Sequence, residues 1–184
     1  MGQTLLTHRR GVLTGLLVAG LTPLAGCMNK PLRPANTDGT YCYSVGKSLR
    51  RNETCTTAPI PTMQAEAEAK RFEPSPGLLT VYVVRKRWGD AKNVVRLTPN
   101  QGSAVTMVPE SFVRLRLTPG TNKLAAAWDE GNTALEVTGK AGEVVFVELI
   151  GSVWSWGSSY RLEQGSAAAS RERALGLRLV ADIG

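Results

Sequence analysis

Thiols and imidazoles, which serve as nucleophiles, bases and zinc ligands, are few in this chain. The sequence contains three cysteines, Cys27, Cys42 and Cys55, and one histidine, His8. His8 lies in a basic head that precedes an apolar run from Gly11 to Leu21, which is the order of a cleaved secretory signal. Without His8, no imidazole is left to activate a thiol, and two thiolates alone do not complete a zinc site. We therefore predict a protein that is not an enzyme and holds neither a metal nor another cofactor.

Cys27 follows the short stretch Leu24–Gly26 at the end of the apolar run. This order resembles the lipobox of bacterial lipoproteins. The resemblance implies cleavage after Gly26, a diacylglyceryl thioether on Cys27 and acylation of the new amine. A transmembrane helix is the competing interpretation. It is disfavoured because only about a dozen residues separate Arg10 from Pro23, whereas a span needs roughly 20.

The residues around the expected cleavage site indicate the membrane to which the protein is sorted and the pathway by which it is exported. By the familiar lipoprotein sorting rule, an aspartate after the acylated cysteine favours inner-membrane retention. Met28 at that position therefore predicts an outer-membrane protein that faces the periplasm. Arg9 and Arg10 partly resemble a twin-arginine signal, although two adjacent arginines are ordinary in a basic head, so the sequence leaves the export route open.

The length and charge of the processed chain limit its class. Removal of residues 1–26 leaves 184 − 26 = 158 residues, enough for one domain with a hydrophobic core. The formal charge falls from +7 to +5 because two arginines leave with the signal. Export makes nucleic acid an unsuitable partner for this basic chain. Lipid headgroups, anionic envelope polymers or simply water are the remaining contacts for the positive charge.

Cys42 and Cys55 are left as an even pair once Cys27 carries lipid. Exported chains fold in an oxidising compartment, where such pairs form disulfides. We therefore predict a Cys42–Cys55 bond that closes a short loop.

The chain divides into four segments by composition. We expect a signal peptide over residues 1–26, a lipidated flexible tether over 27–40, a disulfide-closed extension with a short helix over 41–76, and a β-domain over 77–184. Residues 63–72 are rich in helix formers and are followed by two prolines. From residue 78 onward, short β-branched runs alternate with turn signals, and residues 166–175 read as a second short helix. This pattern predicts an all-β fold, an antiparallel sandwich with one or two short helices.

Several of these strands resemble a known family. The stretches 80–85, 112–120 and 141–147 resemble the strands and turns of a small β-domain of unknown function found in bacterial outer-membrane lipoproteins. The resemblance covers about residues 77–180 and extends to PEGA-like periplasmic modules of immunoglobulin-like architecture. It implies a β-sandwich and an envelope location, and it brings no catalytic residues.

Two groups of side chains are candidates for binding. Trp154 and Trp156 are two residues apart, so on an expected strand both side chains point to the same side, and Tyr160 is close in sequence. They form part of the core, or a pair that shields the open end of the sandwich, or a platform that stacks on a sugar or docks a partner. The second group, Arg85, Lys86 and Arg87, ends the first strand of the β-domain. It either reads an anionic patch or protects a sheet edge from pairing.

The sequence thus favours a non-enzymatic outer-membrane lipoprotein that supports an envelope or secretion assembly by binding another protein. The alternative is a module that binds an envelope saccharide or an anionic polymer through Trp154, Trp156 and the basic group.

Overall fold

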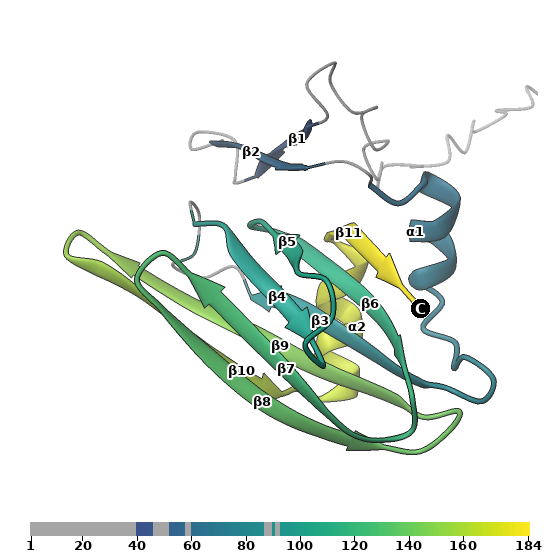
Figure 1. Cartoon of the computed structure of the whole chain (residues 1–184). Helices are drawn as coiled ribbons and strands as arrows, with labels where there is room; N and C mark the ends of the chain where they lie inside the picture. The colour runs from purple at the N-terminus through teal and green to yellow at the C-terminus, as the bar shows by residue number, and fades with distance from the viewer. Residues whose placement is uncertain (1–39, 46–51, 58–59, 87–89, 91–92) are drawn as a thin grey trace, which may run out of the picture.

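A computed structural model describes residues 40–45, 52–57, 60–86, 90 and 93–184. Cys27 and Arg87 lie outside these residues, as does the side chain of Lys86. The described part contains eleven strands and two helices (Figure 1). In chain order they are β1 (Thr40–Val45), β2 (Asn52–Thr57), α1 (Met63–Ala69), β3 (Leu79–Lys86), β4 (Val95–Pro99), β5 (Val105–Met107), β6 (Ser111–Leu117), β7 (Gly120–Trp128), β8 (Gly131–Gly139), β9 (Val144–Trp154), β10 (Gly157–Gln164), α2 (Ala167–Leu175) and β11 (Arg178–Ile183).

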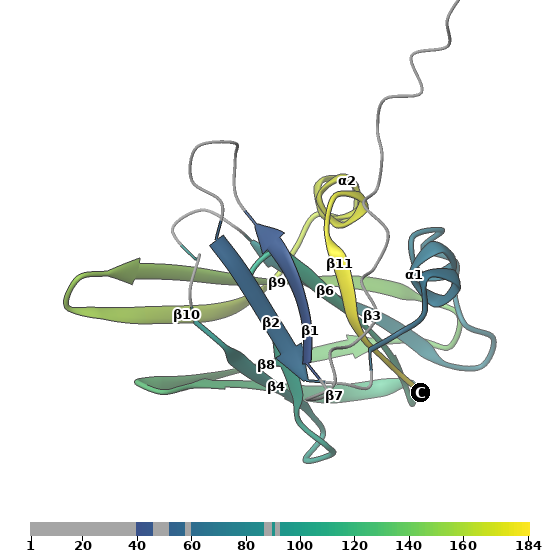
Figure 2. The same ribbon diagram turned by 90° about the horizontal axis from the view of Figure 1, so that it is seen from above.

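The strands from β3 onward form two sheets that pack face to face. The larger sheet has the order β10-β9-β3-β6-β11, and the smaller has the order β5-β4-β7-β8. Both helices cover the outer face of the larger sheet, so the domain has three layers (Figure 2). The predicted all-β sandwich with short helices is confirmed.

Two pairings in the larger sheet are parallel, β3 with β9 and β6 with β11. The chain leaves β6 for the smaller sheet, forms the β7–β8 hairpin there, and returns as β9 beside β3. It reaches β11 through α2. Crossover connections of this kind place a strand parallel to its neighbour. The larger sheet is therefore mixed, whereas the sequence predicts only antiparallel strands.

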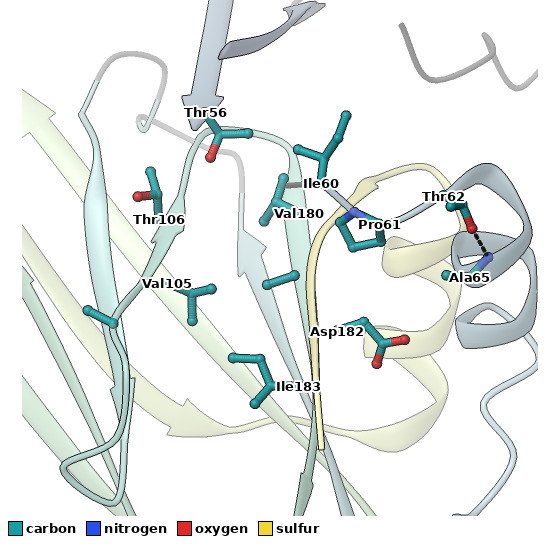
Figure 3. Close-up of a pocket in the computed structure, with 12 residues that line it drawn as sticks. Thr56, Ile60, Pro61, Thr62, Ala65, Val105, Thr106, Val180, Asp182 and Ile183 are labelled. Carbon is teal, nitrogen blue, oxygen red and sulfur yellow. Dashed lines mark hydrogen bonds between the residues drawn. The ribbon is translucent and has the colours of Figure 1, made fainter. Parts of the chain in front are cut away.

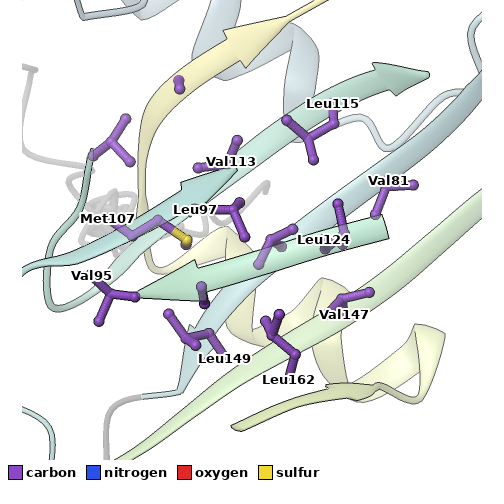
Figure 4. Close-up of a cluster of buried hydrophobic side chains, with 14 of the residues drawn as sticks. Val81, Val95, Leu97, Met107, Val113, Leu115, Leu124, Val147, Leu149 and Leu162 are labelled. Carbon is purple, nitrogen blue, oxygen red and sulfur yellow. The ribbon is translucent and has the colours of Figure 1, made fainter. Parts of the chain in front are cut away.

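The main hydrophobic core lies between the sheets (Figure 4). Along β3, Leu79, Val81 and Val83 enter this core, because alternate residues of a strand face the same side. Tyr82 and Val84 face the opposite side and pack under the helices with Phe72 and Phe146. A strand buried on both faces explains the almost continuous apolar composition of β3.

The N-terminal extension is joined to the same core. Cys42 and Cys55 lie opposite each other in the β1–β2 hairpin and form the predicted disulfide, which is thereby confirmed. Tyr41 and Val45 on β1 belong to the main cluster. The Tyr43 hydroxyl donates a 2.7 Å hydrogen bond to the carbonyl of Pro109. The extension thus packs as part of the β-domain.

Helix α1 is fixed at its start and along one side. The hydroxyl of Thr62 accepts a 3.1 Å hydrogen bond from the Ala65 N–H, which caps the first turn. The buried carboxylate of Glu66 accepts hydrogen bonds from Lys70 at 2.6 Å and from the Leu179 N–H at 3.1 Å. Glu66 therefore covers the beginning of the β11 edge.

Candidate functional site

The β9–β10 hairpin is the most projecting element of the described chain (Figure 1). Its turn consists of two residues, Ser155 and Trp156, because Trp154 pairs with Gly157. Gly157 has φ of +154°, a conformation that favours glycine. Beyond Ile150, β9 has no further pairing with β3. Its last four residues therefore extend about 13 Å past that strand.

Trp154 and Trp156 lie at the tip of this hairpin and are exposed by 57% and 84%. Their rings stack, with centroids 5.9 Å apart and planes 9° apart. The interpretation of these indoles as core residues is therefore wrong. The spacing does bring them together, but through the turn, because Trp156 is a turn residue and not a strand residue.

The hairpin tip is braced by the neighbouring β7–β8 turn. Glu130 in that turn accepts hydrogen bonds from both the N–H and the hydroxyl of Ser158, the latter at 2.7 Å. These two hydrogen bonds lower the pKa of Glu130 from its ordinary value. The brace links the β9–β10 hairpin of the larger sheet to the β7–β8 turn of the smaller sheet.

Tyr160 does not join the indoles at the tip. Its side chain is buried, and its ring packs against Trp128 with centroids 5.1 Å apart. Its hydroxyl donates a 2.7 Å hydrogen bond to Asp90. Burial, followed by the bond to Asp90, raises the pKa of the phenol. Tyr160 is thus an interior residue near the base of the hairpin.

Arg85 is also an interior residue and cannot belong to a surface patch, so both of its predicted roles are wrong. Its side chain is fully buried, and its guanidinium donates to both oxygens of Asp90 at 2.6 and 2.5 Å. Further bonds of 2.6 Å run to the carbonyls of Met107 and Asn93. Alternate residues of a strand face the same side. Arg85 therefore points between the two sheets, like Val81 and Val83 on the same strand.

A cavity of about 540 Å³ opens along the edge of the sandwich (Figure 3). We name it the edge groove. It runs beside two edge strands, β11 of the larger sheet and β5 of the smaller sheet. Apolar side chains such as Val105, Val180 and Ile183 predominate in its walls. The full lining is Thr56, Ile60, Pro61, Thr62, Ala65, Ala104, Val105, Thr106, Val180, Ala181, Asp182 and Ile183.

Asp182 is the one acidic residue in this lining. Arg114 binds its carboxylate through two hydrogen bonds of 2.8 and 2.6 Å, and Arg116 approaches to 3.0 Å. The charge of Asp182 is therefore compensated, and the groove is suited to apolar side chains and backbone groups. Sequence reasoning missed the groove because it depends on which strands end up at the edges of the sheets.

Within the described residues, no three His, Cys, Asp or Glu side chains are grouped so that they could hold a metal ion. Among the same residues, neither helix is long and apolar enough to cross a membrane. Compared with known proteins, the chain matches no family model and no curated sequence. The resemblance to the lipoprotein β-domain thus stays a prediction.

Proposed function

We propose that the protein is a non-enzymatic outer-membrane lipoprotein that faces the periplasm and supports an envelope or secretion assembly by binding another protein. The observation that carries the binding role is the edge groove between β5 and β11. The lipobox-like sequence that ends at Cys27 supports the anchor.

The edge groove has the features of a site for an extended segment of a partner. Among the described strands, β11 pairs with β6 alone and β5 with β4 alone, so none of them occupies the second side of either strand. Glu66 covers the start of the β11 edge, while Val180–Ile183 line the groove. A partner strand that pairs with this edge gains main-chain hydrogen bonds, and its alternate side chains enter the apolar groove.

A non-enzymatic role is supported by the placement of the polar groups. Arg85, Asp90 and Tyr160 form the main buried hydrogen-bonded cluster near the hairpin, and none of them is more than 6% exposed. A substrate cannot reach groups that are closed to water. Their mutual bonds instead stabilise the interior of the sandwich.

The anchor is tested by labelling cells with palmitate. The wild-type chain should carry the label and fractionate with the outer membrane, whereas Cys27→Ser should be unprocessed and unlabelled. Cys42→Ser is a matched control that removes a thiol and should retain the label. A labelled Cys27→Ser protein would contradict the anchor.

The groove is tested by photo-crosslinking in cells that express the full chain. A photoreactive residue in place of Val105 or Ile183 should give an adduct to an extended segment of one envelope protein, identified by peptide mapping. Ala134, exposed on β8, provides the control position and should give no such adduct. Equal adducts at all three positions, or no protein adduct from the groove, would contradict the docking role.

The alternative function is the binding of an envelope saccharide or an anionic polymer. The exposed faces of Trp154 and Trp156 favour it, because sugar rings stack on indoles. Burial of Arg85 weakens the polymer version, since this charge is not available at the surface. Co-sedimentation with purified peptidoglycan or lipopolysaccharide, lost in Trp154→Ala, would favour the alternative over a protein partner.

A further inference from the structure

Two large apolar side chains adjoin each other at the tip of the β9–β10 hairpin. The other exposed large apolar residues of the described chain, Met63, Val94 and Leu175, lie on α1, before β4 and on α2. Single exposed apolar residues are ordinary on a protein surface, whereas adjoining ones mark a contact site. We name the tip formed by Trp154 and Trp156 the tryptophan tip. Its two adjoining exposed indoles make it a candidate contact surface.

The polar surroundings of the tryptophan tip suit a lipid–water interface. Ser155 lies in the turn, Ser152 and Ser159 pair just behind it, and all three are uncharged and at least partly exposed. Indoles combine an apolar body with one N–H donor, and they concentrate at the headgroup level of bilayers for this reason. A ring of small hydroxyl side chains can meet the headgroups while the indoles lie deeper.

The shape of the tip also favours a membrane over a small ligand. Ligand sites are concave, and the edge groove is lined by no residue of the β9–β10 hairpin. The tip is instead a two-residue turn on a projecting hairpin, and its indoles cover one ring face each by stacking on one another. The brace between Glu130 and Ser158 holds this projection in place before any contact is made.

The chain length upstream of the domain brings a bilayer within reach. Thr40, the first residue of β1, is 40 − 27 = 13 residues from Cys27. Thirteen residues span at most about 45 Å when extended. A domain tethered over this distance explores a thin layer next to the membrane, where a weak apolar contact is favoured by its high local concentration.

We propose that the tryptophan tip enters the lipid–water interface of the membrane to which Cys27 tethers the chain. The inference rests on the proposed anchor for its high local concentration. With the lipid at one point and the tip at another, the hairpin end of the sandwich is turned toward the bilayer. Exposed acidic residues at the adjacent turn, Asp129 and Glu130, oppose attraction by anionic lipid. Burial of the indoles therefore drives the contact.

The test uses the full, lipidated chain reconstituted into vesicles of phosphatidylethanolamine and phosphatidylglycerol. Bromine-labelled acyl chains quench the fluorescence of indoles that lie in the bilayer, and iodide quenches those in water. Subtracting the signal of the double variant Trp154→Ala/Trp156→Ala isolates the two tip indoles from the other tryptophans. We expect this difference signal to be quenched by the brominated lipid and shielded from iodide. A higher phosphatidylglycerol fraction should not increase the quenching.

Controls separate a lost contact from a lost fold. Leu175→Ala removes an exposed apolar side chain on α2 and should leave the bromine quenching unchanged. The double tryptophan variant should melt within about 2–4 °C of the wild type, because surface substitutions change stability little. Ser158→Ala should reduce quenching while both indoles remain, since it removes one hydrogen bond of the brace without a change of charge.

Each alternative outcome has a distinct signature. Tip indoles that stay open to iodide and are not quenched by brominated lipid would overturn the membrane contact. The same holds if only peptidoglycan fragments or a protein partner shields them. If the chain proves not to be acylated, the anchor is refuted, and the tip contact is then tested separately with an excess of vesicles. Quenching by brominated lipid in that experiment supports the tip contact, and no quenching refutes it as well.

Discussion

Arg85 and Asp90 form an ion pair inside the sandwich, with both side chains fully buried. Two parallel hydrogen bonds of 2.6 and 2.5 Å join the guanidinium to the carboxylate. Tyr160 completes the cluster from β10, through its own bond to Asp90. Strand β3, the loop after it and the base of the β9–β10 hairpin are thus joined at one point.

Removal of one partner should be severe because it leaves an uncompensated buried charge. We expect Asp90→Ala to lower the free energy of unfolding by about 3–5 kcal/mol, measured by chemical denaturation. The exposed pair Arg161 and Glu163 provides the control, and Glu163→Gln should cost less than about 1 kcal/mol. Equal losses in both variants would contradict the special importance of the buried pair.

Gly151 should be intolerant of a side chain. A Cβ at this position would lie 2.4 Å from a ring carbon of Tyr160 and 2.8 Å from the Asp90 carboxyl carbon. Overpacking of this kind costs about 1–3 kcal/mol, and we expect Gly151→Ala to lower the melting temperature accordingly. At Gly176 the added carbon would come no closer than 3.7 Å to its nearest neighbour, so Gly176→Ala is the matched control. If Gly151→Ala melts like the control, the close packing is wrong.

Buried phenols predict a loss of stability in alkali. Burial is the main cause that raises the pKa of Tyr43, Tyr82 and Tyr160 above their ordinary value of 10.0. A raised pKa in the folded state means that the folded protein holds the proton more tightly than the unfolded chain. The corresponding stability is complete below pH 10 and is lost as the pH rises toward the folded-state pKa.

This alkaline loss is measured by thermal melting between about pH 8 and pH 11.5, a range that spans the ordinary phenol pKa. The melting temperature of the wild type should fall above pH 10, and Tyr43→Phe should reduce the slope of that fall. Phenolate absorbance should rise only as the protein unfolds. Phenols that titrate near pH 10 in the folded protein would contradict the prediction.

The Cys42–Cys55 bond should stabilise the extension and, through it, the shared core. A disulfide that closes a loop of this length contributes about 3 kcal/mol. We expect a reductant to lower the denaturation midpoint of the wild type. The Cys42→Ser/Cys55→Ser variant should already have the lower midpoint and should not respond to the reductant. Identical midpoints with and without reductant in the wild type would count against this role.

The local pattern of the sequence predicts the strands well because burial alternates along them. In β6, Val113 and Leu115 face the core, while Arg114 and Arg116 face the other side and bind Asp182. The disulfide was predictable for a different reason, since the expected compartment leaves few other fates for two cysteines. Both inferences need only local sequence or a count of residues.

The site depends on contacts that a single sequence does not reveal. The Arg85 side chain is buried because Asp90 and Tyr160 meet it, and Tyr160 is 75 residues away. The spacing of Trp154 and Trp156 is the same whether they lie on a strand or across a turn. Gly157 directly after them is the one local signal for a two-residue turn. The edge groove depends on the order of strands in both sheets and has no local signal.

The parallel pairing of β3 with β9 affects the time at which the chain can fold. Thr80 lies beside Val144, which is 144 − 80 = 64 residues later, and Glu66 reaches Leu179 across 113 residues. Chains dominated by such distant contacts fold slowly, because much of the chain must be present and ordered before the contacts form. The centre of the larger sheet cannot assemble until β9 has been made. A chain with this topology therefore stays open until most of the domain has been synthesised, which leaves time for the proposed export to begin before the sheet closes.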